Sequence, residues 1–214
     1  MSTFREISIQ IADVYEYTYL FLGIFALLIP KVRKDYSWIL FFLLFTGVLR
    51  IGSIFMAESE VNSIPIYHLI GLSELVLVYI IYRSQNVLKS WKYVFFLLVG
   101  LYLFHSLFVG SIWEMNGLAQ ATVQLFIFGL SVNYLFELYN RTTNSRKAIP
   151  VFFFANAGFM AYAAGSFLVF IINERIIHGM SDDLFDNAWL IEAGFGAIRL
   201  IFIGITFRLV NFEK

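Results

Sequence analysis

Long apolar runs, separated by short polar segments, constrain this chain more than any other feature. The run "WILFFLLFTGVL" at 38–49 contains no charged residue, and similar runs recur along the 214 residues. A helix that crosses the hydrocarbon core of a bilayer, about 30 Å thick, needs roughly 20 such residues. Lipid cannot satisfy exposed backbone groups, and these unbroken runs lack the alternation of a barrel strand. The sequence therefore predicts an all-α integral membrane protein.

Seven stretches have the required length, so we expect one domain, a seven-helix bundle over residues 1–214. The expected membrane-spanning helices lie near 11–30, 38–57, 65–83, 92–111, 117–139, 149–173 and 186–208. Composition agrees, because 60% of the residues are hydrophobic and only 14% are charged, against about 25% charged in soluble domains. Cysteine is absent, which excludes disulfides, thiolate zinc sites and iron–sulfur clusters.

The polar connections alternate in charge along the chain. Basic residues gather in 31–36, 83–92 and 141–147, whereas the intervening connections carry mostly Asp and Glu. Connections rich in Lys and Arg stay in the cytoplasm. We therefore expect the N-terminus outside and the C-terminus in the cytoplasm, with the lipid bilayer of a cell inner membrane as the immediate partner. No basic face typical of nucleic-acid binding is present, so no nucleic-acid partner is expected.

Ionisable and amide side chains within the spans are the candidate functional residues. Such groups are costly in lipid and usually face a bundle interior or a wet cavity. The expected orientation places most of them in the outer half, together with Asp13 and Glu16 of the first span. The sequence thus predicts an outward-facing polar pocket formed by Arg50, His68, Glu74, His105, Gln124, Glu192 and Arg199. A smaller inner-side set consists of Asn133, Glu137 and Asn156.

The same charged residues have a structural interpretation. Arg50 with Glu192, or Arg199 with Glu74, would then form buried ion pairs that fix the register of the helices. The two histidines would be core residues with satisfied hydrogen bonds. Both interpretations stay open at the level of the sequence.

Two small-residue patterns stand out in the last two spans. Ala157, Ala161 and Gly165 recur every four residues, which predicts close approach of another helix. The segment "EAGFGAIR" at 192–199 places Gly194 and Gly196 between Glu192 and Arg199. Because transporters often use broken helices at their binding sites, this segment is the candidate for such a break.

Metal binding is a minor alternative for the pocket. His68, Glu74, His105 and Glu192 offer imidazole and carboxylate ligands that suit zinc, but no HExxH motif brings two of them together on one helix. No cofactor is therefore predicted. Retinal is not expected either, because the seventh span contains no lysine for a Schiff base.

Two stretches resemble recurring patterns in small seven-helix membrane proteins of Bacteroidetes-type bacteria. One is "IPIYHLIGLSELVLVYIIYR" at 64–83, which contains His68 and Glu74. The other is "PVFFFANAGFMAYAAGSFLVFI" at 150–171, which contains Asn156. The resemblance implies a bacterial inner-membrane protein, and no particular activity comes with it.

Three functions follow from the expected pocket. The first is a sensor or receptor-like protein that binds a small ligand from outside and acts through a cytoplasmic signalling partner, since the short loops hold no effector domain. The second is a small-solute transporter or channel, whose path would continue through the inner-side set. The third is a membrane-embedded, metal-dependent hydrolase, although an enzyme is less expected. A structural role and a homo-oligomer also stay open.

Overall fold

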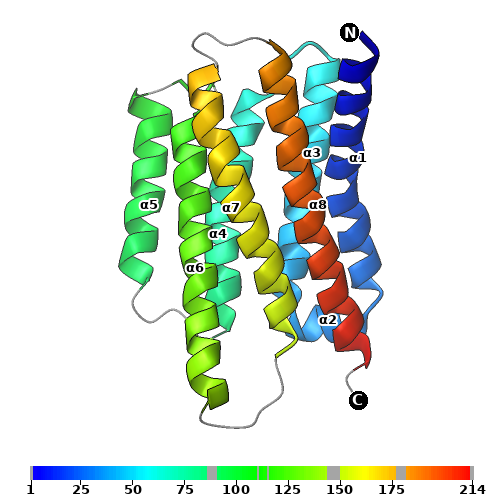
Figure 1. Cartoon of the computed structure of the whole chain (residues 1–214), viewed down its shortest axis with the longest axis vertical. Helices are drawn as coiled ribbons and strands as arrows, with labels where there is room; N and C mark the ends of the chain where they lie inside the picture. Colours follow the sequence, from blue (N-terminus) through cyan, green and yellow to red (C-terminus); the bar gives the residue numbers. More distant parts are fainter. Residues whose placement is uncertain are drawn as a thin grey trace.

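The computed structural model describes residues 2–85, 91–109, 111–114, 116–143, 150–176 and 182–212, and over these residues it contains helices and no strand. The elements are α1 (Ser2–Leu27), α2 (Pro30–Asp35), α3 (Ser37–Glu58), α4 (Ile64–Ser84), α5 (Lys92–Phe104), α6 (Gly117–Thr143), α7 (Phe152–Ile176) and α8 (Asp182–Phe212). The chain is thus all-α over the described ranges, as predicted (Figure 1).

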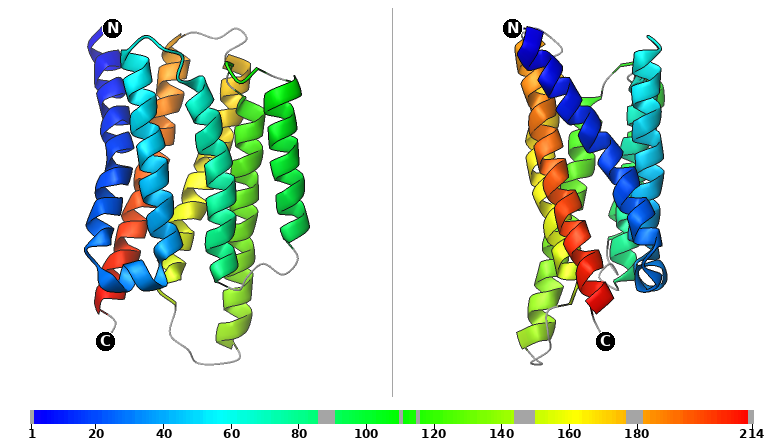
Figure 2. Two further views of the ribbon diagram at one scale, coloured as in Figure 1. Left: turned by 180° about the vertical axis from the view of Figure 1, so that it is seen from behind. Right: turned by 90° about the vertical axis from the view of Figure 1, so that its right-hand side faces the viewer.

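Six long helices form a closed ring. In the order α1, α3, α4, α6, α7 and α8, each helix contacts the next, and α8 contacts α1 to close the ring. The remaining long helix over the described ranges, α5, stands outside this ring against α4. Figure 2 shows α1 crossing obliquely between the two sides of the bundle. The first turns of α1 and the last turns of α8 lie at opposite ends (Figure 1), which we call the N-terminal and C-terminal ends of the bundle.

Within the described ranges, six helices are long and apolar enough to cross a membrane. They are Ser37–Glu58, Ile64–Ser84, Lys92–Val109, Gly117–Asn140, Phe152–Ile172 and Trp189–Phe212. Their outward faces carry large apolar side chains, among which Phe96, Phe108 and Phe136 are 67–76% exposed. Extended apolar surface of this kind marks contact with lipid or a partner. The chain therefore has the character of a multi-pass membrane protein.

The first predicted span differs from the others. Helix α1 is not among these six apolar helices, because Asp13, Glu16 and several tyrosines interrupt its hydrophobic run. The helix also ends at Leu27 and not at residue 30. Ile29 is extended (φ −98°, ψ 103°), as expected for a residue that precedes a proline, and Pro30 begins the short helix α2. The other six predicted spans match helices to within a few residues.

The glycines of "EAGFGAIR" do not break the last helix. Helix α8 runs without interruption from Asp182 to Phe212, so the predicted broken helix is wrong. A Cβ at Gly196 would overlap the ring of Tyr15 of α1. This glycine therefore permits close packing between α1 and α8.

The interruption lies in α5 instead. After Phe104 the helix widens into a π-helical segment, His105–Val109. Single π turns of this kind occur often at functional sites. The apolar composition of the segment gave no sign of it.

Close packing of α7 on α8 depends on two glycines seven residues apart. A Cβ at Gly158 would lie 2.9 Å from Phe202 Cβ and 3.0 Å from the carbonyl oxygen of Arg199, and a Cβ at Gly165 would overlap the Phe195 ring. The prediction of a close helix approach is thus confirmed at Gly165. The second contact residue is Gly158, one position after Ala157.

Replacing Gly158 with alanine should destabilise the bundle. The new methyl group meets backbone of α8, which cannot move without separating the helices, and such overpacking costs about 1–3 kcal/mol. The matched control is Gly194→Ala, because a Cβ there meets nothing within 4 Å and alanine favours a helix over glycine by about 0.5–1 kcal/mol. Thermal unfolding in mild detergent should rank Gly158→Ala below the control. Equal melting temperatures would contradict the packing described.

Candidate functional site

Arg50 of α3 lies at the centre of the bundle and is 3% exposed. Its Nη1 donates a hydrogen bond of 2.7 Å to Glu16 Oε1 of α1. Its Nη2 lies 3.8 Å from Glu74 Oε1 of α4 and 3.9 Å from Glu192 Oε1 of α8. One guanidinium group therefore faces carboxylates from three helices, and the pair with Glu16 is the shortest.

Arg199 of α8 is fully buried. Its Nη2 donates to Glu74 Oε1 at 3.0 Å and also to the hydroxyl of Tyr19. Its guanidinium carbon lies 3.4 Å from the centre of the Tyr162 ring and 5.4 Å from that of Phe42. Aromatic faces attract a desolvated cation, so these rings help to stabilise a charge whose Nε and Nη1 have no hydrogen-bond partner among the described residues.

The two carboxylates deepest in this site have unequal partners. Glu74 accepts hydrogen bonds from Arg199 at Oε1 and from Gln124 Nε2 at Oε2, each at 3.0 Å. Glu192 accepts a 2.9 Å hydrogen bond from the Tyr162 hydroxyl, while its nearest cation is Arg50 at 3.9 Å. Glu74 is therefore held by an ion pair and two hydrogen bonds, whereas Glu192 is held mainly by the hydrogen bond from Tyr162.

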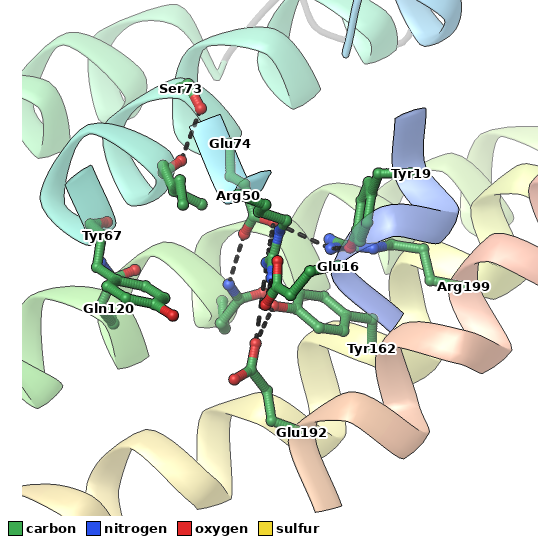
Figure 3. A network of polar contacts seen from close by, with 12 residues as sticks. Glu16, Tyr19, Arg50, Tyr67, Ser73, Glu74, Gln120, Tyr162, Glu192 and Arg199 are labelled. Atoms are coloured by element: carbon green, nitrogen blue, oxygen red, sulfur yellow. Dashed lines mark hydrogen bonds and ion pairs between the residues drawn. The ribbon is translucent and has the colours of Figure 1, made fainter. Parts of the chain in front are cut away.

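We call these residues the central charge network: Glu16, Tyr19, Arg50, Glu74, Gln124, Tyr162, Glu192 and Arg199. Each of the six ring helices supplies at least one member, and Figure 3 shows the side chains converging between the helices. The members are at most 7% exposed. The network contains two guanidinium groups and three carboxylates, so one carboxylate is in excess.

A small cavity adjoins the network on the side of the N-terminal end. Its volume is about 20 Å³, and its lining includes Arg50, Tyr67, Glu74, Gln120 and Glu192. Trp189 also lines it and contacts Tyr67, with 5.6 Å between the ring centres. A site for one water needs about 10–15 Å³, so the cavity has room for one group of that size.

Five of the seven predicted pocket residues come together here. Arg50, Glu74 and Glu192 line the cavity, while Gln124 and Arg199 bond to Glu74 from the far side. The predicted pair of Arg199 with Glu74 is present. Arg50 lies nearer to Glu16 than to the predicted partner, Glu192.

The two predicted histidines lie apart from the network. His68 contacts the carbonyl oxygen of Glu114 at 2.9 Å through Nε2 and Ser106 Oγ at 3.4 Å through Nδ1. His105 Nδ1 pairs with the Asn116 side chain. Neither histidine lines the small cavity, because both point toward the α5–α6 connection.

The four predicted metal ligands are therefore not brought together. Glu74 and Glu192 face Arg50, whereas His68 and His105 have other partners. Over the ranges that the structure describes, no three His, Asp or Glu side chains form a group that could hold a metal ion. The geometry thus offers no support for a zinc site built from these residues.

The inner-side set lies nearer the C-terminal end. Asn156 is fully buried and accepts a 2.6 Å hydrogen bond from the Tyr82 hydroxyl, which also contacts Ser131 Oγ at 2.7 Å. Asn133 and Glu137 are only partly buried on α6. Two phenylalanines, Phe42 and Phe159, stand between Arg199 and Tyr82, with successive spacings of 5.4, 5.7 and 6.2 Å.

The predicted pocket residues did not include the tyrosines of the network. Tyr19 and Tyr162 bond to Arg199 and Glu192, and Glu16 is the closest anion of Arg50. The signal was present in "DVYEYTYL", where Tyr15 and Tyr19 share a helix face one turn apart. Tyrosines in an otherwise apolar span indicate hydroxyl groups that need partners inside the bundle.

No protein-family model, curated protein or solved structure matches this chain. The site must therefore be interpreted from its own geometry.

Removing Arg199 should destabilise the protein strongly. Arg199→Met removes the nearer cation of the buried Glu74 carboxylate and leaves only Arg50, at 3.8 Å, and loss of one partner of a buried pair costs about 3–5 kcal/mol. Adding Glu74→Gln should recover part of that loss, since the orphaned charge disappears. Unfolding free energies of the two single variants and the double variant in mixed micelles measure the coupling.

The matched control for this cycle is Glu58→Gln, which neutralises an exposed carboxylate at the end of α3. Surface changes of this kind usually stay within about 0.5 kcal/mol. Strictly additive losses for Arg199→Met and Glu74→Gln would show that the two side chains do not stabilise each other.

Proposed function

We propose that this chain is a receptor-like membrane sensor in which the central charge network is the switch and the small cavity is the binding site. The observation that carries the proposal is the position of Arg50. Its guanidinium group holds Glu16 at 2.7 Å and stands 3.8–3.9 Å from two further carboxylates. A small movement would exchange its partner and would shift α1 relative to α4 and α8.

The charge count supports a small cation as the ligand. Arginine keeps its charge in proteins, so three ionised carboxylates leave the network with one excess negative charge. A buried charge without compensation costs several kcal/mol. A cation bound between Glu74 and Glu192 would remove that cost, and a cavity of about 20 Å³ limits its size to roughly that of water.

The region between the network and the C-terminal end supports sensing over transport. Phe42, Phe159 and Tyr82 are fully buried there and form a continuous aromatic contact. A transport path would need polar groups to continue past these rings. A sensor needs only that helix positions change when the ligand binds.

The charge pattern supports the proposed orientation and the proposed cytoplasmic partner. The basic helix α2, with Lys31, Arg33 and Lys34, lies across the C-terminal end and contacts α1, α3 and α8. By the positive-inside rule this end would face the cytoplasm and the cavity would open outward. A cytoplasmic signalling partner would then read movements of α2. The proposed location is an inner membrane, which the resemblance to proteins of Bacteroidetes-type bacteria supports.

The fluorescence of Trp189 tests this proposal. The indole lines the cavity and contacts Tyr67, so occupation of the cavity should change its emission. Purified protein in nanodiscs is titrated with ammonium chloride. A control titration uses N-methylglucamine chloride, whose cation is too large to enter the small cavity. We expect a saturable change with ammonium that Trp189→Phe removes.

Glu192→Gln is the discriminating variant for this titration. It keeps an acceptor for Tyr162 but removes the excess charge, so the apparent Kd for ammonium should rise about tenfold or more, equivalent to about 1.4 kcal/mol. Glu58→Gln should bind as the wild type does. Emission that stays constant in both salts and from pH 5 to 8 would contradict the proposal.

A pH series without ammonium identifies the proton as the ligand if it reproduces the same emission change. Glu192 is the group expected to take the proton, and the groups that face it are Glu16 of α1, Arg50 of α3, Tyr67 and Glu74 of α4, and Tyr162 of α7. Glu192→Gln should then show the low-pH emission at every pH.

A further inference from the structure

A second and larger cavity lies between α4, α5 and the first turns of α6. Its volume is about 290 Å³, and apolar side chains form most of its lining, including Leu75, Leu98, Leu101, Phe104 and Val123. A dry apolar cavity of about 150 Å³ is enough to bind benzene. We call this cavity the lateral groove.

The groove lies beside a helix, α5, that packs little of its surface on the rest of the bundle. Near its start, Trp91 packs on Phe126 of α6 with 5.8 Å between the rings, and Phe95 stacks on Tyr79 of α4 at 3.9 Å. Toward the other end the helix widens into the π segment His105–Val109. Only 17% of the span Lys92–Val109 is buried, against 44–56% of the other five spans.

The surroundings of the groove identify its occupant. Leu101 and Phe104 at the mouth are more than half exposed, whereas Leu75 and Val123 at the floor are at most 2% exposed. Because α4, α5 and α6 are all long and apolar enough to cross a membrane, the mouth of the groove, between these helices, opens to the surrounding lipid. An apolar chain that enters from the bilayer would therefore reach side chains in the interior of the bundle.

We propose that the lateral groove binds one hydrocarbon chain of a membrane amphiphile, with the polar head group near His105. The imidazole lines the groove at the end nearer the α5–α6 connection, where its Nδ1 pairs with Asn116. Tyr102 lines the same end. The imidazole gives one end of an otherwise apolar site a polar character, which is the polarity of a single-chain amphiphile such as a fatty acid.

The groove also connects to the central charge network. Tyr102 donates to the carbonyl oxygen of His68 at 3.0 Å, and its hydroxyl accepts a 3.1 Å hydrogen bond from Gln120 Nε2. Gln120 lines the small cavity. A Cβ at Gly71 would overlap both Gln120 and Tyr102, so this glycine is what allows the contact. A chain in the groove would thus alter the network through Tyr102, a step that rests on the proposed function.

Photolabelling with a diazirine-bearing palmitic acid tests the binding step. Full-length protein in nanodiscs is labelled, digested and mapped by mass spectrometry. We expect adducts concentrated in 98–109 and 118–123. Ala119→Phe fills the groove and should lower labelling of these peptides about tenfold, a loss equivalent to about 1.4 kcal/mol.

Leu125→Phe is the matched control, because Leu125 lies on the same helix, is 54% exposed and does not line the groove. Its labelling should equal that of the wild type. Thr122→Phe also fills the groove and replaces Ala119→Phe if that variant fails to fold. Adducts spread evenly over all lipid-facing helices, with no loss in the filled variants, would overturn the proposal.

The connection to the network has a separate readout. Palmitic acid should change Trp189 emission in the wild type. The change should be much smaller in Gly71→Ser, because the new serine side chain separates Tyr102 from Gln120. Labelling of the groove without any change in Trp189 emission overturns the connection and leaves the binding site standing. If the wild type is labelled in the groove but its Trp189 emission does not respond to ammonium, the proposed function is overturned and the lateral groove remains a binding site.

Discussion

The structure depends on two guanidinium groups held in the interior of a bundle whose outer surface is apolar. A buried arginine is tolerated only when carboxylates and hydrogen bonds compensate its charge. Here the compensation comes from Glu16, Glu74 and Glu192, which lie on three different helices. The requirement to bring these groups together fixes how α1, α3, α4 and α8 are rotated about their axes. The aromatic rings around Arg199 add α7 to the same constraint.

This arrangement divides the bundle into a tightly packed ring of helices and one loosely packed helix, α5. The six ring helices share the central charge network, whereas α5 contributes none of its members and touches the ring mainly through α4. The proposed switch at the network and the proposed binding groove beside α5 are therefore compatible in one small protein. Tyr102 and Gln120 are the residues through which the two parts meet. In the proposed sensor, a cation bound between Glu74 and Glu192 would favour one arrangement of the ring helices over another.

The sequence predicted the helices well because apolar runs of about 20 residues have one solution in lipid. The positions of Arg50, Glu74, Glu192 and Arg199 along their apolar runs also indicated that these side chains could meet, and the structure brings them together. It could not predict which helices are neighbours, so Glu16 was not recognised as the anion nearest Arg50. His68 and His105 were assigned to the pocket on depth alone, although they face the α5–α6 connection. The π segment of α5 depends on packing and has no local signal.

The free energies of unfolding of two neutralised variants, Glu16→Gln and Glu192→Gln, test the central claim most directly. Both changes are isosteric and both lie in the same network, but Glu16 forms the short pair with Arg50 whereas Glu192 is the carboxylate in excess. The account predicts that Glu16→Gln destabilises the protein by about 3 kcal/mol and that Glu192→Gln leaves it as stable as the wild type or more stable. Equal losses, or a larger loss for Glu192→Gln, would contradict it.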